Sequence, residues 1–183
     1  MRISRFIIGL SLVLIMVWGN SHLVMGEESF FKDYNVVVVE ELEVPSGSPA
    51  PESAGLQMAE KAIYQLKRYS EKYSLFEIIA KEGGKASKEI PSRKKVLIIK
   101  GEVKEYSVPT VGRRIGRSFI PGREYTGTAA FAARYKFIDK ENGKVIYETD
   151  LRTTSTGSHD TVEYAMDRNG EALAKIITKY KGK

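Results

Sequence analysis

The segment from residue 111 to residue 123 holds the side chains best suited to binding chemistry, because four arginines and three glycines gather there between two strand-like stretches. Guanidinium groups bind carboxylate or phosphate oxygens two at a time, and an aromatic side chain among them can rest on a partner. The residues predicted to make such a contact are Arg113, Arg114, Arg117, Phe119 and Arg123. A solvated loop without a partner is the alternative reading, and contact with a membrane is a third. The glycines do not form a phosphate-binding loop, since the lysine and Ser/Thr that close that motif are absent.

A serine, a histidine and an aspartate stand side by side at Ser158, His159 and Asp160. A catalytic triad needs residues that converge in space, which neighbours in sequence rarely do. We expect helix capping instead, with Ser158 and Asp160 at the helix start and Glu163 completing a capping box with Asp160. His159 is the one histidine after residue 26, which argues against a histidine-based metal site. No metal and no other cofactor is predicted.

Four carboxylates on strand-like stretches could supply a general acid and base. They are Glu102, Glu105, Glu148 and Asp150. Carboxylates on strands more often form a solvated face, so the chain is not predicted to be an enzyme, and catalysis by these acids is kept as the competing hypothesis.

The elements that must position these side chains begin with residues 34–40, a continuous β-branched run typical of a strand buried on both faces. An amphipathic helix of about five turns should begin near Ser53, and a second strand should follow at residues 75–80. A helix that joins two strands suggests a βαβ unit. A third strand is predicted at residues 95–106.

Three tyrosines lie along that first helix, at Tyr64, Tyr69 and Tyr73. They could form an aromatic surface for a glycan or a peptide, but their helical spacing favours partial burial in the core.

A long hairpin from Glu124 to Thr156 is predicted to organise the domain. Apolar residues alternate along residues 125–137, and the return strand puts Val145 on the same buried side as its other alternate residues. Between the two strands, Asn142-Gly143 predicts a type I′ turn with positive φ at both residues.

The last element is a helix that begins at Asp160 and carries one apolar stripe to the lysine-rich end. Gly170 should weaken this helix by about 1 kcal/mol relative to alanine, unless close packing requires it. The predicted fold is α+β: a two-layer sandwich with a mixed sheet of about five strands and two helices on one face, in the order β-α-β-β-β-β-α.

Residues 1–26 have the layout of a signal peptide, with Arg2 and Arg5 before an apolar run of about 13 residues, too short to span a bilayer. Cleavage is expected after Gly26, and an uncleaved anchor is the minority reading. Residues 27–183 then form a single domain, with a net charge that falls from +6 to +4 when the two arginines are lost. The chain has no cysteine, so it is not expected to be a lipoprotein or to form disulfides.

The stretch Leu97–Tyr106, the strand Gly127–Ile138 and the turn Asp139–Val145 resemble the bacterial exported domain-of-unknown-function family number 4410. The element order is also similar to that of curli-secretion-type and TolB amino-terminal-type envelope domains. The resemblance implies an exported envelope protein that serves binding or assembly, and it supplies no functional residues.

These observations predict an exported, periplasmic, non-catalytic binding or assembly module of the cell envelope. An envelope enzyme, or a subunit of an outer-membrane assembly, is the alternative. The expected partner is an envelope protein or an anionic envelope component, and membrane contact would be peripheral. Nucleic acid is not expected, because an exported protein rarely meets it. The sequence leaves the oligomeric state open.

Overall fold

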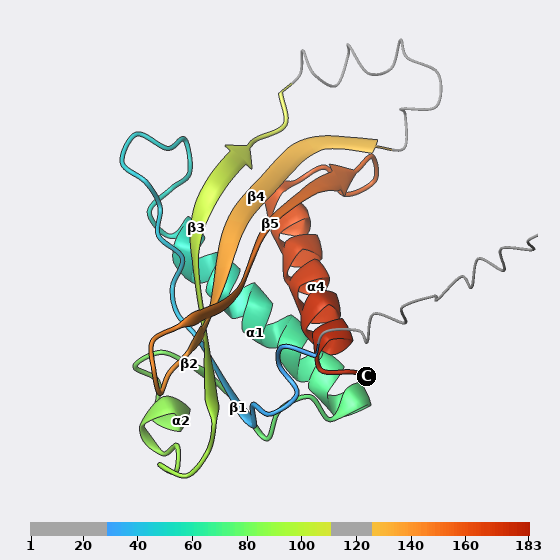
Figure 1. Cartoon of the computed structure of the whole chain (residues 1–183). Helices are drawn as coiled ribbons and strands as arrows, with labels where there is room; N and C mark the ends of the chain where they lie inside the picture. Colours follow the sequence, from blue (N-terminus) through green and yellow to red (C-terminus); the bar gives the residue numbers. More distant parts are fainter. Residues whose placement is uncertain (1–28, 111–125) are drawn as a thin grey trace, which may run out of the picture.

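The computed structural model describes residues 29–110 and 126–183 (Figure 1). Its strands are β1 (Val36–Val39), β2 (Ile78–Lys81), β3 (Val96–Ser107), β4 (Thr126–Asp139) and β5 (Val145–Thr156). Its helices are α1 (Ala54–Tyr73), the short α2 (Lys85–Lys88) and α4 (Val162–Tyr180). Within these ranges no helix is both long and apolar enough to cross a bilayer. The expected signal peptide, residues 1–26, lies outside the described residues.

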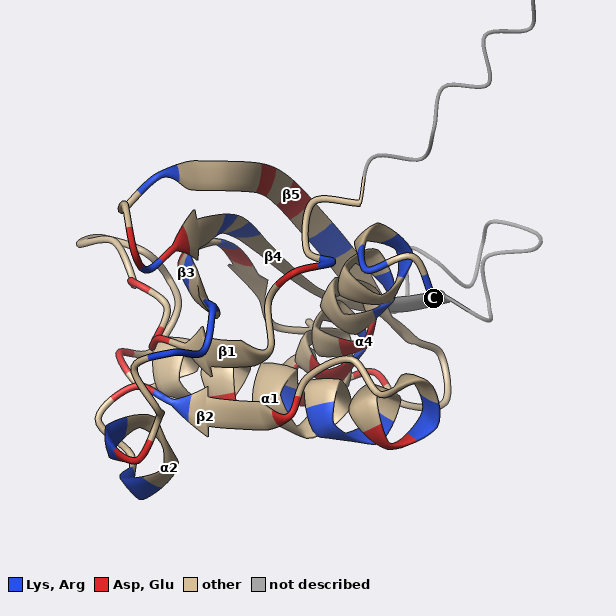
Figure 2. Ribbon diagram, turned by 60° about the horizontal axis from the view of Figure 1, so that its bottom comes forward, with Lys and Arg blue, Asp and Glu red and all other residues tan. Residues whose placement is uncertain are grey.

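The five strands form one mixed sheet in the order β2-β1-β3-β4-β5. The strands β2, β1 and β3 run parallel, whereas β3, β4 and β5 are antiparallel. Helices α1 and α4 pack against each other and against one face of the sheet (Figures 1 and 2). The predicted α+β two-layer sandwich is confirmed, and the short helix α2 was not predicted.

Strand β1 is buried on both faces, as its four consecutive valines predict. Val37 and Val39 belong to the main core beneath the helices, and Val36 and Val38 pack with Val96 on the other side. The strand pairs in parallel with both β2 and β3. The predicted βαβ unit is therefore present, and it places the end of β1 inside the sheet.

The alternation predicted for β4 is confirmed, because alternate residues on one side of the strand are buried from Ala129 to Phe137. These residues are Ala129, Phe131, Ala133, Tyr135 and Phe137, each at most 1% exposed. In the neighbouring strand β5, Val145 pairs with Ile138 and is 44% exposed. The prediction that Val145 lies on the buried side is wrong, because a register shift beside Phe137 and Ile138 turns the first residue of β5 outward.

The hairpin turn also differs from the prediction. Gly143 has a φ of +69°, but Asn142 does not have a positive φ, so a type I′ turn is excluded. The Asp139 carboxylate instead accepts a hydrogen bond from the backbone N–H of Glu141 (2.8 Å), and the Gly143 N–H bonds to the Asp139 carbonyl (2.9 Å). A longer turn results, because the aspartate side chain captures a donor that a two-residue turn would leave free.

Two glycines set how closely the layers approach. A Cβ on Gly170 of α4 would lie 3.1 Å from the Lys61 carbonyl oxygen of α1, so close helix packing accounts for this mid-helix glycine. A Cβ on Gly55 would lie 1.9 Å from the Leu42 carbonyl oxygen, which no side chain can occupy. The start of α1 is thereby held directly beneath the segment that follows β1.

Candidate functional site

The five residues predicted to contact a partner are not described by the structure. Arg113, Arg114, Arg117, Phe119 and Arg123 all lie within residues 111–125, outside the described residues. Their role stays a prediction, and the site below is built from other residues.

The face of the sheet opposite α1 and α4 carries rows of charged side chains across β3, β4 and β5. In one row Glu102 stands beside Arg134, and Arg134 beside Asp150. In the next row Lys100 stands beside Lys136, which stands beside Glu148. Cross-strand neighbours lie about 5 Å apart, so this open face is a lattice of interacting charges.

The four carboxylates considered as catalytic acids belong to this lattice, and each pairs with a cation. Glu102 pairs with Lys104, and Glu105 accepts two hydrogen bonds from Arg152 at 2.7 and 3.0 Å. Asp150 and Glu148 share the Arg134 guanidinium, whose Nε lies 2.9 and 3.5 Å from them.

The electrostatics of the pair between Arg134 and Asp150 oppose a role for Asp150 as a general acid. Hydrogen bonds from Arg134 lower the pKa of the Asp150 carboxyl below its ordinary value, whereas a general acid needs a raised pKa. The hydrogen bonds that Arg152 donates to the Glu105 carboxylate raise the pKa of Arg152. These ion pairs therefore favour the charged forms of Asp150 and Arg152.

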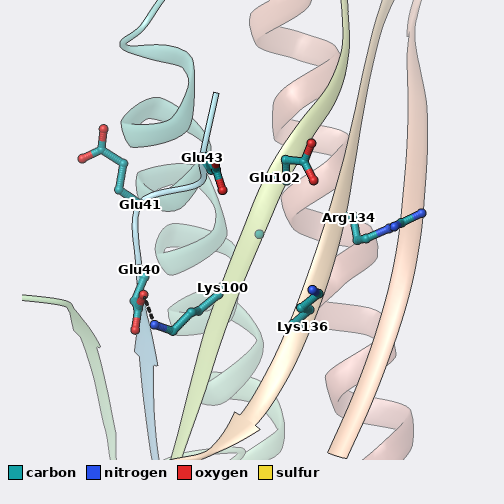
Figure 3. A pocket seen from close by; sticks show the side chains of 8 residues that line it. Glu40, Glu41, Glu43, Lys100, Glu102, Arg134 and Lys136 are labelled. Atoms are coloured by element: carbon teal, nitrogen blue, oxygen red, sulfur yellow. Dashed lines mark ion pairs between the residues drawn. The ribbon is translucent and has the colours of Figure 1, made fainter. Parts of the chain in front are cut away.

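A hollow of about 310 Å³ opens on this face, where the segment after β1 leaves the sheet beside β3 and β4. Its lining residues are Glu40, Glu41, Glu43, Lys100, Gly101, Glu102, Arg134 and Lys136. Figure 3 shows the carboxylates of the segment after β1 on one side and the cations of β4 on the other. The hollow thus has an acidic wall and a basic wall.

Part of this charge is committed within the chain. Lys100 Nζ lies 2.9 Å from Glu40 Oε2, and the hydrogen bond raises the pKa of Lys100. Glu41, Glu43 and Lys136 make no ion pair with any other residue that the structure describes. These three side chains are the charges that an incoming polar group would meet first.

The backbone explains why the hollow lies here. Glu43 forms an isolated parallel bridge with Glu102, and its N–H bonds to the Gly101 carbonyl at 2.8 Å. A Cβ on Gly101 would lie 2.7 Å from the Arg134 carbonyl oxygen and 2.9 Å from Leu42 Cγ. The absent side chain leaves room for the segment after β1 to cross close to the sheet.

Sequence reasoning did not single out this site. The signal available was Glu40-Glu41-x-Glu43 directly after a buried strand, which places acids at a strand's carboxyl end. The register between β3 and β4 decides that β4 supplies the opposing cations, and the sequence alone does not give this register.

The prediction that Asp160 caps the last helix is wrong. The N-cap is Thr161, whose Oγ1 accepts from the Tyr164 N–H at 3.2 Å. The Asp160 carboxylate instead accepts hydrogen bonds from Ala129 N (2.9 Å), Ser155 Oγ (2.7 Å) and Thr128 Oγ1 (2.8 Å), and from Thr128 N. Partial burial raises the pKa of Asp160, but these hydrogen bonds outweigh it and hold the pKa well below its ordinary range. Asp160 therefore ties the start of β4 to the end of β5.

Ser158 and His159 do not form catalytic geometry with Asp160. Ser158 Oγ lies 3.0 Å from His159 Nδ1 and 3.3 Å from Thr156 Oγ1, and the His159 ring stacks on Tyr164. Ser158 does not cap the helix either. The cluster is a turn that brings the chain from β5 into α4.

The tyrosines of α1 divide between burial and exposure. Tyr69 and Tyr73 are half-buried, as their spacing predicts, but Tyr64 is 61% exposed. The prediction fails for Tyr64 because α1 buries the adjacent side of the helix, with Ala62, Gln65 and Leu66 inward.

No model of a known protein family matches the sequence, and no curated protein matches it. Solved structures do share the fold. A PelC variant dodecamer from Paraburkholderia phytofirmans is 14% identical, with a TM-score of 0.51, and the match covers 78% of this chain and 88% of that chain. A second PelC dodecamer from the same organism is 15% identical with a TM-score of 0.50 and the same coverage.

Protein XCC0632 from Xanthomonas campestris, a DUF330 protein, is 8% identical with a TM-score of 0.51, and the match covers 81% of this chain and 84% of that chain. At these identities the likeness is one of fold. The resemblance to family 4410 and to curli-type and TolB-type domains is not confirmed.

Proposed function

We propose that the chain is an exported binding or assembly module of the bacterial cell envelope, without catalytic activity, that engages a protein partner through the open face of its sheet. The observation that carries the proposal is the hollow with an acidic wall and a basic wall, in which Glu41, Glu43 and Lys136 have no ion pair among the described residues. A polypeptide segment that bears both charges is the kind of surface that such a hollow complements.

Three further points support a binding role. The carboxylates of the open face are held in ion pairs with arginine or lysine, which favours a fixed pattern of charge over an acid–base pair. Among the described residues, His, Cys, Asp and Glu do not gather in groups that could hold a metal ion. The PelC structures that share the fold are dodecamers, so a domain of this kind can serve in an assembly.

Export and the location in the periplasm belong to the same proposal. They rest on the apolar run that follows Arg2 and Arg5 and on the acidic residues after Gly26. Mass spectrometry of the protein recovered from cells would show an amino terminus near Glu27. Recovery of the full chain in the cytoplasmic fraction would overturn this part of the proposal.

Crosslinking and pull-down from intact cell envelopes test the binding role with two charge-reversed proteins. The first carries Glu41→Lys, Glu43→Lys and Lys136→Glu, which leave the ion pairs of the lattice in place. The second carries glutamate at residues 113, 114 and 117, the arginine segment predicted from the sequence. A third protein with Lys85→Glu and Lys88→Glu, on the distant α2, is the control.

We expect one dominant partner with the wild-type protein and the control, and loss of that partner in the first variant. Loss in the second variant alone would move the interface to the arginine segment. Identical partners from all four proteins would exclude both surfaces, and no partner from any of them would favour the envelope-enzyme alternative.

A further inference from the structure

Strand β5 is the outermost strand of the sheet, and one of its two edges has no neighbouring strand among the described residues. It pairs with β4 on the other side (Figure 1). It has 12 residues, whereas β2 at the opposite edge of the sheet has 4. A long open edge is a template for pairing with another chain. The hollow that carries the proposed function is lined by no residue of β5.

The hydrogen bonds of β4 fix the direction of its backbone groups. The Lys140 N–H bonds to the Val96 carbonyl at 3.1 Å, on the side of β3. The Asp139 N–H bonds to the Lys144 carbonyl at 2.9 Å, on the side of β5. Successive residues of a strand turn their N–H and C=O groups to opposite sides. The even-numbered residues of β4 therefore face β3, and the odd-numbered residues face β5.

The register between β4 and β5 carries this alternation to the edge of the sheet. Leu151 stands opposite Ala133, so the odd-numbered residues of β5 face β4 in turn. The N–H and C=O groups of Glu148, Asp150 and Arg152 point away from the sheet. In the part of the chain that the structure describes, nothing bonds to these outward groups.

Helix α4 limits this free edge at one end. The Arg168 side chain donates from Nη1 to the Thr154 carbonyl at 2.8 Å. Thr154 also faces outward, so its carbonyl already has a partner. The part of the edge that remains open to another strand runs from Glu148 to Arg152.

The side chains of this free edge carry charges of both signs. Glu148, Asp150 and Arg152 are exposed on the open face of the sheet. Charges on an edge strand oppose pairing with most other strands, but these three complement a second copy of the chain. Two copies related by a two-fold axis pair in antiparallel orientation. When the axis passes through Leu151, Asp150 of each copy stands opposite Arg152 of the other.

Charge also excludes the neighbouring registers. An axis through Asp150 brings the two Asp150 carboxylates together, and an axis through Arg152 brings the two guanidinium groups together. An axis through Thr149 places Glu148 opposite Asp150. Like charges directly opposite each other destabilise an antiparallel pair, and opposite charges stabilise it. The axis through Leu151 therefore gives two attractive contacts and no repulsive one.

The ion pairs within each chain leave capacity for these contacts. Arg152 donates to Glu105 from Nε and Nη2, at 2.7 and 3.0 Å, which leaves Nη1 for another acceptor. Asp150 accepts two bonds from Arg134, at 2.9 and 3.2 Å, and an ionised carboxylate can accept about four. The contacts between copies can therefore form without breaking the pairs inside each copy.

We propose that two copies of the chain dimerise through the outer edges of β5, antiparallel about an axis at Leu151, into one sheet of ten strands, five from each copy. Asp150 and Arg152 of the two copies exchange backbone hydrogen bonds, and the half-buried Leu151 side chains meet on the helix side. The shared open face carries both hollows. The inference goes beyond the proposed function and does not depend on it, since dimerisation needs no other protein.

Single cysteines test this register, because the chain has none of its own. In Leu151→Cys the two thiols meet at the axis, where the Cα atoms of a pair without hydrogen bonds are about 4.5 Å apart, within disulfide range. In Thr149→Cys the two positions lie four residues apart, or about 13 Å, beyond that range. Mild oxidation should therefore give a covalent dimer from Leu151→Cys alone.

A mixing experiment sharpens the same test. The proposed axis places Thr149 of one copy opposite Thr153 of the other. Thr149→Cys mixed with Thr153→Cys should therefore form a disulfide-linked pair, although neither variant forms one by itself. Equal crosslinking of Leu151→Cys and Thr149→Cys, or crosslinking of neither, would overturn the proposal.

Sedimentation equilibrium measures the dimer without a crosslink. Asp150→Pro removes an outward N–H that the pairing with β4 does not use, a place where an edge strand tolerates proline. Asp150→Ala is the matched control, because it loses the same carboxylate and keeps the N–H. Two hydrogen bonds are lost per dimer, so Asp150→Pro should dimerise about 30-fold more weakly than Asp150→Ala. Equal dissociation constants for the two variants, or a wild-type protein that is monomeric throughout, would refute the proposal.

A last variant separates this interface from the hollow of the proposed function. The protein with Glu41→Lys, Glu43→Lys and Lys136→Glu should dimerise as the wild type does, because its changes lie outside β5. Loss of the dimer in this variant, with the dimer kept in Asp150→Pro, would move the contact between copies to the hollow and overturn the assignment to β5.

Discussion

Replacing Asp160 by asparagine is expected to destabilise the domain by about 3 kcal/mol. In the native protein Oδ1 accepts from Thr128 N, Ala129 N and Ser155 Oγ, while Oδ2 accepts from Thr128 Oγ1. Asparagine keeps one oxygen for the first three donors, but it removes the negative charge. A hydrogen bond to a charged group contributes about 1.5–3 kcal/mol, against about 0.5–1.5 kcal/mol for a neutral one. Three bonds that each lose about 1 kcal/mol give the expected total.

The effect of Asp160→Asn should depend on pH in a defined direction. The folded state lowers the pKa of Asp160, so the unfolded chain binds a proton more readily than the native protein in the acidic range. The stabilisation by Asp160 is therefore complete above the unfolded pKa of about 3.9, and it is lost as the pH falls through the folded value. The difference between wild type and variant should stay constant from about pH 7 to about pH 5, and it should shrink as the pH is lowered further to about 3.

Urea unfolding followed by circular dichroism measures both effects, since the free energy of unfolding is obtained from the transition midpoint and its slope. Asp150→Asn is the matched control, because it makes the same chemical change at an aspartate whose side chain is 63% exposed and pairs with Arg134. An exposed ion pair contributes about 0–1 kcal/mol. If the two variants lose equal stability, or if the loss for Asp160→Asn stays constant with pH, the account of the Asp160 site is wrong.

Two further substitutions test the packing of the layers. Gly55→Ala should destabilise the protein by roughly 3 kcal/mol or more, because the new Cβ would lie 1.9 Å from the Leu42 carbonyl oxygen and the backbone would have to move. Thermal unfolding measures this loss of stability, with Gly143→Ala as the comparison. An equal loss of stability in the two variants would contradict the prediction. Tyr135→Phe should lower the free energy of unfolding by about 1–3 kcal/mol, since the Tyr135 hydroxyl donates to Asn169 Oδ1 at 2.7 Å in a buried site. A loss under about 0.5 kcal/mol in urea unfolding would show that the Asn169 side-chain amide finds another partner.

The fold was largely predictable because its elements follow from hydrophobic period. The valines of β1, the alternation along β4 and the stripe of α4 each fit one secondary structure. Consecutive elements left few ways to build the sheet, since a helix between two strands favours a parallel pair and a short turn favours an antiparallel one.

The errors came from side chains that bond to distant or unexpected backbone groups. Asp160 was assigned to its own helix, yet its carboxylate bonds to β4, more than thirty positions earlier in the chain. Asp139 likewise replaced a two-residue turn with a longer one by bonding to Glu141. A sequence pattern describes residues that are neighbours along the chain, so it does not predict contacts between residues that only the folded sheet brings together.

The candidate site escaped prediction for a related reason. The acids of the segment after β1 and the cations of β4 are about ninety residues apart, and the register of β3 between them decides which charges meet. The arginines of residues 111–123 were singled out because they are adjacent in sequence, which is the kind of cluster a linear reading detects.

The amino-terminal segment that lies against the end of α4 also constrains the order in which the protein can fold. Lys181 Nζ donates to the carbonyl oxygens of Phe31 and Tyr34, at 3.2 and 2.7 Å, across 150 and 147 positions of the chain. The buried ring of Phe31 packs beside Tyr180 at 6.0 Å and cannot find this neighbour before α4 has been synthesised. A nascent chain therefore cannot close this part of its core until its last helix has been made.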